Sequence, residues 1–232
     1  MKIESFPRKL FLFRNNLCMF AQTQNELHNM KHMSILAVSL LALVACTPEK
    51  KQEADYSQYV NPMIGTDFTG NTYPGAQVPF GMVQLSPDNG LPGWDRISGY
   101  FYPDTTIAGF SHTHLSGTGA GDLYDISFMP VTRPYKEAPA PLGIYSTFSH
   151  NDEAASAGYY RVLLKDYNIN VELTATERCG IQRYTFPEAE ASVFLNLKKA
   201  MNWDFTLDSK IEVVDSTTIR GYRLSQGWSC LL

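Results

Sequence analysis

The second half of the chain alternates apolar and polar residues with a period of two. After Gly158, the apolar positions fall into short groups that turn residues separate, as in "YRVLL", "INVEL", "IQRYTF" and "SVFLNL". A period of two places alternate side chains on opposite faces of an extended chain, so each group predicts a strand. The apolar positions are Val162, Leu164, Ile169, Val171, Leu173, Ile181, Tyr184, Phe186, Val193, Leu195 and Leu197.

Turn residues join these groups into hairpins. The stretches "KDYN" (165–168) and "FPEAEA" (186–191) supply turns, and "IEVVDSTTIRGYRL" (211–224) predicts a further hairpin. No amphipathic helix is evident after residue 56. Strands at this spacing predict an all-β fold, an antiparallel β-sandwich, rather than alternating strands and helices.

The preceding part of the chain, Tyr59–Pro130, has a different composition. It is dense in Gly, Pro, Asp, Thr and aromatic residues. Such a composition suits long ordered loops over a sheet, and ordered loops on a rigid scaffold commonly carry binding sites. We therefore expect a binding surface here.

The stretch "MKHMSILAVSLLALVAC", Met30–Cys46, has the features of a signal peptide. Its apolar part, Ser34–Ala45, would span about 18 Å as a helix, which is too short for a bilayer core of about 30 Å. The ending "LVAC" resembles the bacterial lipobox, so we expect Cys46 to be lipidated and the protein to be exported and lipid-anchored, in the periplasm or at the cell surface.

Three further segments follow from that assignment. Residues 1–29 precede a complete signal peptide, which predicts a non-native leader from an early start codon. An anchor within Leu10–Phe20 is the alternative, but Arg14 lies in its middle. Residues 30–45 are the signal peptide, residues 46–55 a flexible polar tether, and residues 56–232 the folded domain.

Charge and cysteines narrow the choice of partners. The chain carries a net charge of −4, and the part after Cys46 is more acidic still, which argues against a nucleic-acid partner. Cys179 and Cys230 are the remaining cysteines of the exported part. An exported chain could pair them, but their spacing does not predict it, and we expect two buried free thiols.

The stretch "GFSHTHLSGTGAGD", Gly109–Asp122, is the first candidate for chemistry. His112 and His114 at i and i+2 would share one face of a strand and could hold a metal with Asp122 or Asp125. Zinc normally takes three or four ligands, and the exported part has no second His or Cys cluster. The spacing alone is therefore weak evidence for a metal.

Phosphate binding and nucleophilic catalysis have less support from the same stretch. "SGTGAGD" lacks the lysine and the strand-to-helix setting of a phosphate-binding loop. Ser111 or Ser116 could act with a histidine, but the strained turn that exposes an attacking serine is missing. Alternatively, these residues satisfy one another inside a polar loop core.

Sugar binding fits the neighbouring stretch "GWDRISGYFY". Carbohydrate sites combine a flat aromatic face with fixed donors and acceptors for hydroxyl groups. Trp94 beside Asp95 is the leading pair, although Trp94 could equally be a core residue and Asp95 a turn residue. The aromatic and charged residues of this stretch are Trp94, Asp95, Arg96, Tyr100 and Tyr102.

Three longer runs resemble one known family. They are "YVNPMIGTDFTGNTYPGAQVPFGMVQLSPD", "GWDRISGYFYPDTTIAGFSHTHLSGTGAGDLYDISFMP" and "AGYYRVLLKDYNINVELTATERCGIQRYTFP". Together they resemble the N-terminal domain of glycoside hydrolase family 92, the calcium-dependent exo-acting α-mannosidases found in Bacteroidetes. The resemblance covers Tyr59 to about Trp228.

The resemblance implies a two-domain enzyme that hydrolyses terminal α-mannosides with inversion. Its N-terminal β-sandwich, of the galactose-mutarotase-like type, packs on a C-terminal α/α barrel, and the active site lies at their junction. Inversion needs one carboxylic acid and one carboxylate base, and in the family these two groups and the calcium belong to the barrel. We therefore assign no catalytic residue, metal ligand or cofactor to this chain.

The resemblance also gives expectations for substrate, partner and completeness. The ligands are mannose-containing glycans, and the partner domain is the barrel. The ending "SCLL" reads as a premature stop or frameshift, so the sandwich is expected to be incomplete at its C-terminal end, with an inactive fragment as the result. Expected substrate-binding positions, which match motifs of the family's N-terminal domain, are Phe68, Gly70, Trp94, Asp95, His112 and His114.

Two other functions stay open. A stand-alone carbohydrate-binding surface lipoprotein is the first, with the stop real and selected. An exported metalloprotein that uses His112 and His114 is the second.

Overall fold

The computed structural model describes residues 54–117, 119–140, 142–187, 190–198 and 202–227. The predicted leader, signal peptide, Cys46 and Cys230 lie outside these residues. The elements in chain order are η1 (Ser57–Tyr59), β1 (Ser86–Asp88), η2 (Trp94–Arg96), β2 (Thr106–Ile107), β3 (Gly109–Ser111), β4 (Ser127–Thr132), β5 (Glu137–Ala138), β6 (Gly143–Ile144), β7 (Ser146–Thr147), η3 (His150–Asp152), β8 (Glu153–Ser156), β9 (Tyr159–Leu164), β10 (Ile169–Ala175), β11 (Gly180–Thr185), β12 (Ala191–Asn196), β13 (Phe205–Val213) and β14 (Ile219–Gln226).

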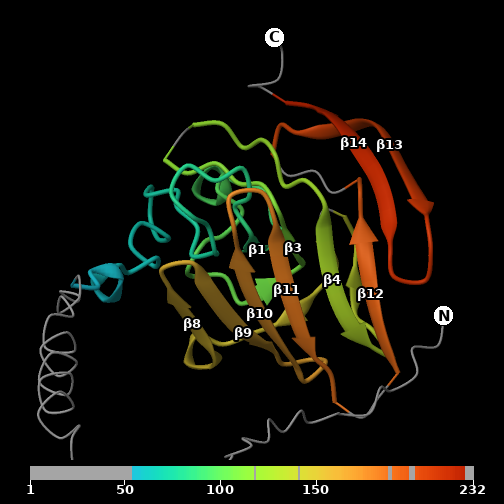
Figure 1. Ribbon diagram of the computed structural model, residues 1–232, viewed down its shortest axis with the longest axis horizontal. Helices are drawn as coiled ribbons and strands as arrows, with labels where there is room; N and C mark the ends of the chain where they lie inside the picture. Colours follow the sequence, from blue (N-terminus) through green and yellow to red (C-terminus); the bar gives the residue numbers. More distant parts are fainter. Residues whose placement is uncertain (1–53, 118, 141, 188–189, 199–201, 228–232) are drawn as a thin grey trace, which may run out of the picture. The chain divides into compact units, whose positions relative to one another are not determined.

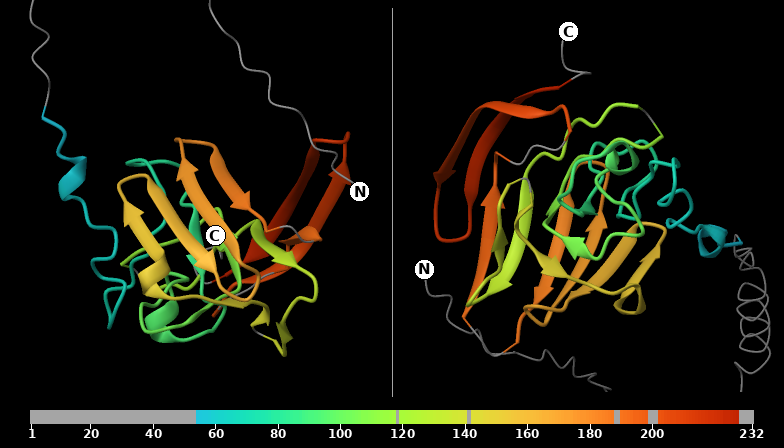
Figure 2. Two further views of the ribbon diagram at one scale, coloured as in Figure 1. Left: turned by 90° about the horizontal axis from the view of Figure 1, so that it is seen from below. Right: turned by 180° about the vertical axis from the view of Figure 1, so that it is seen from behind.

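Two four-stranded antiparallel sheets form the framework. One has the order β1-β3-β4-β12 and the other β11-β10-β9-β8. They lie as two layers, and the hairpin β13-β14 lies beside β12 (Figures 1 and 2). The two-stranded sheets β2-β7 and β5-β6 complete the set found in the described residues. The all-β antiparallel sandwich is therefore confirmed.

The hydrophobic core lies between the two sheets. Phe110 lies in β3 of the first sheet, and Leu85 directly precedes β1 of the same sheet. Val162 and Leu173 come from the second sheet, and all four side chains are essentially without exposed surface. Gly180 marks a close approach of the layers, because a Cβ there would lie 2.8 Å from the ring of His112 and 3.3 Å from Leu85. Burial of these side chains stabilises the sandwich by about 25 cal/mol per Å² of apolar surface.

The predicted hairpins β9-β10 and β13-β14 are present, but β11 and β12 lie in different sheets, so the turn predicted at "FPEAEA" does not close a hairpin. Two of the apolar positions in these strands do not face the core. Ile181 is 57% and Val193 45% exposed, whereas Tyr184 and Phe194 pack against the core. Ile181 and Tyr184 are three residues apart and cannot share one face of a regular strand. Pairing of Tyr184 with core residue Val171 fixes the face, and Ile181 therefore points outward.

The loop-rich first half contributes more regular structure than its composition predicts. Strands β1, β3 and β4 all fall within Tyr59–Pro130 or overlap its end, and they make three of the four strands of one sheet. β1 and β3 are only three residues long, so no alternation could reveal them. Long loops between them form one end of the domain.

Cys179 is a free thiol, but it is exposed, which corrects the prediction of a buried one. It ends the turn between β10 and β11, where its carbonyl accepts from Thr176 N at 2.8 Å and its N–H donates to Thr176 Oγ1 at 3.1 Å. The tight turn holds its side chain outside the sandwich. A search for membrane-spanning helices among the described residues finds none.

Candidate functional site

The stretch Gly109–Asp122 leaves the sheet as β3 and continues into the loop end of the domain. There, Gly117 N donates to the carbonyl of Asn71 at 2.7 Å. Gly119 lies against Trp94, because a Cβ at Gly119 would be 3.3 Å from the indole ring. The stretch therefore meets both the loop that carries Phe68 and Gly70 and the loop that carries Trp94.

His114 lies in a buried polar network beneath these loops. Its Nδ1 lies 2.6 Å from the carbonyl of Gln84, which can only accept, so Nδ1 carries a hydrogen. Its Nε2 lies 2.9 Å from Asp88 Oδ1 and 3.1 Å from Ser111 Oγ. His114 is 3% exposed, and Asp88 and Ser111 are fully buried.

This network does not have the arrangement of a nucleophilic triad. A triad needs the serine on one imidazole nitrogen and the orienting carboxylate on the other. Here Ser111 and Asp88 share Nε2, and Ser111 Oγ is itself 3.1 Å from Asp88 Oδ1. The geometry favours a polar loop core, in which these three side chains satisfy one another.

His112 is half-buried and lies apart from that network. Its Nδ1 lies 2.9 Å from the carbonyl of Ile126, and its ring meets Phe128 edge-on at 5.6 Å. Burial lowers the pKa of His112. Its side chain therefore favours the neutral form. It also lines a hollow between β4, β12 and the hairpin β13-β14.

The possible metal ligands are used in other interactions. Asp125 accepts from Thr113 Oγ1 at 2.9 Å and pairs with Arg223, while His112 and His114 each face a different carbonyl. Within the described ranges, no three or more His, Cys, Asp and Glu side chains lie where they could hold a metal ion. As the described part of the chain places them, His112, His114 and Asp125 do not form a metal centre.

Trp94 occupies the exposed tip of η2. Its side chain is 57% exposed, and Asp95 beside it is half-buried. Arg96, by contrast, is bound by Asp104 through contacts of 2.5 and 2.6 Å and lies 4.8 Å above the ring of Phe101. Trp94 thus faces outward from a turn that the Arg96–Asp104 pair holds in place.

The two tyrosines of the same stretch support the fold. Tyr100 is fully buried and donates its hydroxyl hydrogen to Glu153 at 3.0 Å. Tyr102 stacks on His150, with ring centroids 4.0 Å apart. In the described contacts, neither tyrosine ring pairs with the exposed indole of Trp94.

Phe68 and Gly70 lie in a tight loop that reaches the same end of the domain. Phe68 is 79% exposed and has a positive φ of 50°, which is uncommon outside glycine. Gly70 has no room for a Cβ, which would overlap the backbone of Gly65. The loop connects to Gly117 through Asn71, so Phe68 and Gly70 share a surface with the Gly109–Asp122 stretch.

Sequence reasoning missed one residue of this surface, Trp203. Its indole meets that of Trp94 with centroids 6.1 Å apart and planes 72° apart, and it is 47% exposed. The dipeptide Trp-Asp occurs at 94–95 and again at 203–204, but this repeat does not by itself bring the two indoles together. The candidate site therefore consists of two exposed indoles above a buried polar network.

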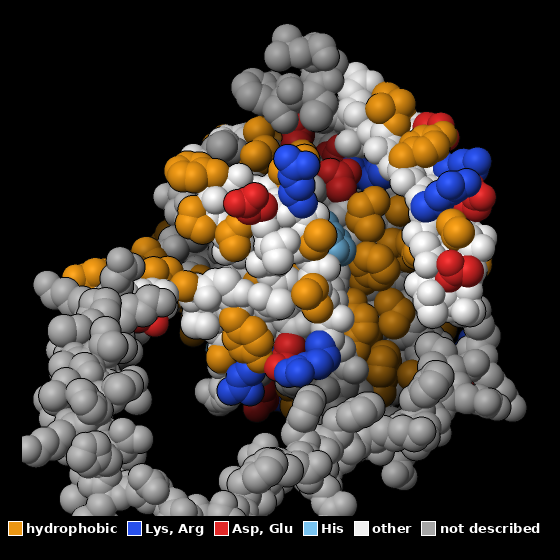
Figure 3. Space-filling model, viewed as in Figure 1, with side chains coloured by type: hydrophobic (Ala, Val, Ile, Leu, Met, Phe, Trp, Pro, Cys, Tyr) orange, Lys and Arg blue, Asp and Glu red, His pale blue; other side chains and the backbone are white. Residues whose placement is uncertain are grey.

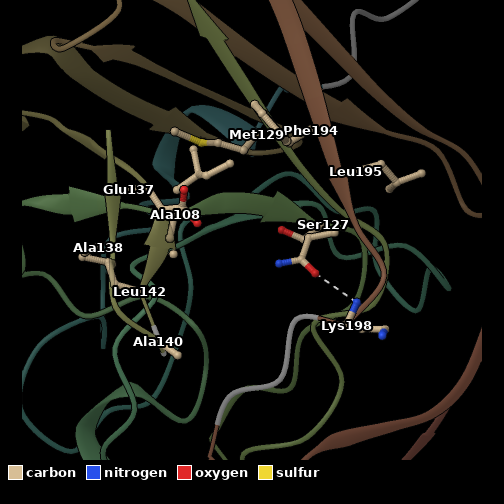
Figure 4. Close-up of a pocket in the computed structure, with 13 residues that line it drawn as sticks. Ala108, Ser127, Met129, Glu137, Ala138, Ala140, Leu142, Phe194, Leu195 and Lys198 are labelled. Carbon is tan, nitrogen blue, oxygen red and sulfur yellow. Dashed lines mark hydrogen bonds between the residues drawn. The ribbon is translucent and has the colours of Figure 1, made fainter. Parts of the chain in front are cut away.

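A cavity lies away from the Trp94 loops, between β4, β12 and the β5-β6 hairpin (Figure 4). It has a volume of about 550 Å³ and a mixed polar and apolar lining that includes Glu137, Met129 and Phe194. It contains none of the six residues expected to bind sugar. We therefore place the candidate site at the loops around Trp94.

Similarity to solved structures defines the class of protein as the N-terminal β-sandwich domain of a glycoside hydrolase. A family 92 α-mannosidase from Bacteroides thetaiotaomicron, solved with mannoimidazole, is 43% identical with a TM-score of 0.70, over 74% of this chain and 23% of its own. A family 92 inverting mannosidase from the same species is 29% identical with a TM-score of 0.61, over 76% of this chain and 24% of its own.

The sequence profile of the glycosyl hydrolase family 92 N-terminal domain matches residues 59–230, and the chain belongs to this family. A curated relative from Arthroderma benhamiae, described as an uncharacterized secreted glycosidase, is 26% identical over 172 residues. That match covers 70% of this chain and 21% of the relative. The chain thus spans about a quarter of the length of the proteins that it matches, and the predicted family is confirmed.

Proposed function

We propose that this chain is the carbohydrate-binding and supporting domain of an α-1,2-mannosidase-like protein that acts on mannose-containing glycans. In the complete enzyme the reaction is inverting hydrolysis, which requires a general acid and a general base on opposite faces of the sugar. We assign both groups, and the calcium of the family, to the catalytic domain. The N-terminal domain contributes the sugar-facing loops.

The observation that carries this proposal is the exposed indole of Trp94 on the loop surface of a family 92 domain. An indole face that water can reach gives the C–H face of a pyranose an apolar surface to bind. The carboxylate of Asp95 is an acceptor for sugar hydroxyl groups. Similarity to a mannosidase solved with mannoimidazole supports mannose as the sugar class.

His112, His114, Phe68 and Gly70 have supporting roles in this proposal. His114 holds the Gly109–Asp122 stretch from beneath through Gln84 and Asp88. Phe68 offers a second apolar surface on the neighbouring loop. Gly70 allows that loop to close tightly.

We expect Trp94→Ala to weaken the binding of an α-1,2-linked mannobiose by about tenfold, because aromatic anchors commonly account for at least that much of a binding constant. Isothermal titration of the purified chain is the measurement. Tyr135→Ala is the control, since Tyr135 is an exposed aromatic residue in a separate contact with Phe194. No heat from wild-type protein at millimolar mannobiose would refute the sugar-binding function.

Incubation of the chain with mannobiose separates a binding domain from an active enzyme. Binding without hydrolysis is also the behaviour expected of a stand-alone carbohydrate-binding lipoprotein. Release of mannose by this chain would contradict our assignment of the acid and base to the catalytic domain.

We further propose that the protein is exported and that Cys46 is lipidated. The description of a relative as a secreted glycosidase supports the export. Cys46→Ser removes the thiol that would carry the lipid, so the protein is expected to move from the membrane fraction to the soluble fraction. Mass spectrometry of the N-terminal peptide checks the modification. Cys179→Ser is the matched control, and an unlipidated N-terminal peptide in the wild type would refute the anchor.

A further inference from the structure

Trp203 forms an aromatic pair with Trp94 that the sequence alone did not suggest. The two residues are 109 positions apart, and their indoles meet edge to face at 6.1 Å and 72°. Both remain about half exposed, at 47% and 57%. Tryptophan side chains are highly buried on average, and apolar surface that stays exposed commonly marks a binding site, so an open pair of indoles at a loop surface points to a ligand.

Two interactions fix the segment that presents Trp203. On one side, Asn202 Oδ1 accepts a hydrogen bond from Gly93 N at 2.8 Å, which ties the two tryptophan loops together. On the other side, Asp204 is 5% exposed and forms an ion pair with Arg223 of β14. The residues on both sides of the indole are therefore held, while the indole itself faces solvent.

Glycines make room for this arrangement. A Cβ at Gly121 would lie 2.7 Å from the side chain of Asn202, so only glycine allows Asn202 to approach the Gly109–Asp122 stretch. Gly119 lies against the indole of Trp94 at the same end of that stretch. The small residues of "GAGD" therefore serve to seat the two tryptophan loops.

Two indoles at a steep angle form a corner rather than a flat platform. A pyranose ring has an apolar C–H face and a rim of hydroxyl groups. One indole can take the face of the ring and the second can contact its edge, while Asp95 accepts from a hydroxyl group. Such a corner restricts the sugar's rotation, which a single stacked ring does not.

We propose that Trp203 is a second sugar-contacting residue, that it forms with Trp94 a corner for one mannopyranose unit, and that Asn202 is the positioning residue for this corner. The inference rests on the proposed sugar-binding function and extends it to a residue that neither the motifs nor the comparisons assign. Trp203 contacts the sugar, and Asn202 acts through Trp203.

The first experiment measures affinity for α-1,2-linked mannobiose in wild type, Trp203→Ala and Trp203→Phe. We expect about a tenfold loss for Trp203→Ala and a smaller loss for Trp203→Phe, which keeps an aromatic ring. Tyr222→Ala is the control, because Tyr222 is 49% exposed on β14 and bonds only Asp208 in the described contacts. Thermal unfolding of each variant monitors folding.

The second experiment tests the positioning role. Contacting indoles give an exciton couplet in far-ultraviolet circular dichroism, and Trp203→Ala should remove it. Asn202→Gly removes the acceptor for Gly93 N but tolerates the positive φ of 57°, and it should weaken both the couplet and the affinity. Asn202→Asp keeps an acceptor oxygen at this position and should restore them.

The outcomes distinguish this inference from the proposed function. If Trp203→Ala binds mannobiose like the wild type while Trp94→Ala does not, the corner is wrong and the sugar-binding function stands. If the wild type does not bind, both fail. An unchanged couplet in Asn202→Gly would overturn the positioning role of Asn202 alone.

Discussion

Replacing Arg223 by methionine is expected to destabilise the domain by about 3–5 kcal/mol, because it removes the cation from a buried ionic cluster. The guanidinium is 1% exposed and binds Asp125 and Asp204, and its Nε donates to Thr206 Oγ1 at 3.0 Å. Methionine has a similar length but no charge. Two carboxylates would then share an environment that no longer compensates them.

The loss of stability in Arg223→Met should depend on pH and be larger near neutral pH than at acid pH. Burial raises the pKa of Asp204, and the hydrogen bond from Arg223 opposes this rise. A carboxyl group whose folded pKa is raised favours the folded state at acid pH, and this contribution is lost as the pH rises through the folded pKa. Without Arg223 the folded pKa rises further, so Arg223→Met should be most destabilised near neutral pH.

Urea unfolding at about pH 7 and at about pH 4, near the ordinary pKa of aspartate, measures both effects. Arg220→Met is the control, because Arg220 is 70% exposed on the same strand and pairs with Glu212. An exposed pair of this kind contributes about 1 kcal/mol or less. Equal losses in the two variants, or a larger loss for Arg223→Met at acid pH, would contradict the buried cluster.

Three strands of the second sheet, β9, β10 and β11, could be predicted because each has a local alternation of apolar and polar residues. Val162 and Leu164 of β9 pair in register with Val171 and Ile169 of β10, and all four are buried. The orientation of Ile181 could not be predicted in the same way, since the register with β10 decides it. A period of two identifies a strand, but the partner strand decides which face is buried.

Strands β1 and β3 of the first sheet were harder to predict because they are short and contain polar residues. β1 and β3 contain Ser86, Asp88 and Ser111, all fully buried, which composition would place in loops. Their burial is possible because His114 bonds Asp88 and Ser111, and this interaction depends on the folded chain. No local pattern reveals such compensation.

The candidate site was predictable only in part. Trp94 and Asp95 were identified because aromatic and acidic residues are adjacent in one stretch. Trp203 was not identified, since its relation to Trp94 exists only in space.

Hydrophobic side chains are also exposed in a hollow beside the β13-β14 hairpin (Figure 3). The residues that line this hollow include Phe128, Leu195 and Ile219.

The second large effect is expected for Glu153, the centre of a buried hydrogen-bond network. Its side chain is 1% exposed and accepts from Tyr100 and Tyr160 at 3.0 and 2.6 Å. His150 Nδ1 lies 2.7 Å away on the same carboxylate. Glu153→Ala leaves these donors without their acceptor and should destabilise the domain by about 3 kcal/mol or more, since each unsatisfied buried group costs about 1–3 kcal/mol.

The two tyrosines cannot relieve this cost by ionising. Burial raises the pKa of both Tyr100 and Tyr160, and the charge of Glu153 raises them further. Their hydroxyl groups therefore stay protonated in the folded protein at neutral pH and continue to need an acceptor. The penalty in Glu153→Ala should persist across the neutral range.

Urea unfolding of Glu153→Ala, Glu153→Gln and Glu212→Ala tests this network. Glutamine keeps one acceptor oxygen but adds an amide donor, so its loss should fall between those of the other two variants. Glu212 is exposed and pairs only with Arg220 in the described contacts, and its removal should leave the midpoint close to that of the wild type. If Glu153→Ala unfolds at the same urea concentration as Glu212→Ala, the carboxylate does not stabilise the fold. Glu153→Ala should also loosen the backbone at Tyr102, because His150 contacts both Glu153 and, through its Nε2 at 2.7 Å, the Tyr102 carbonyl.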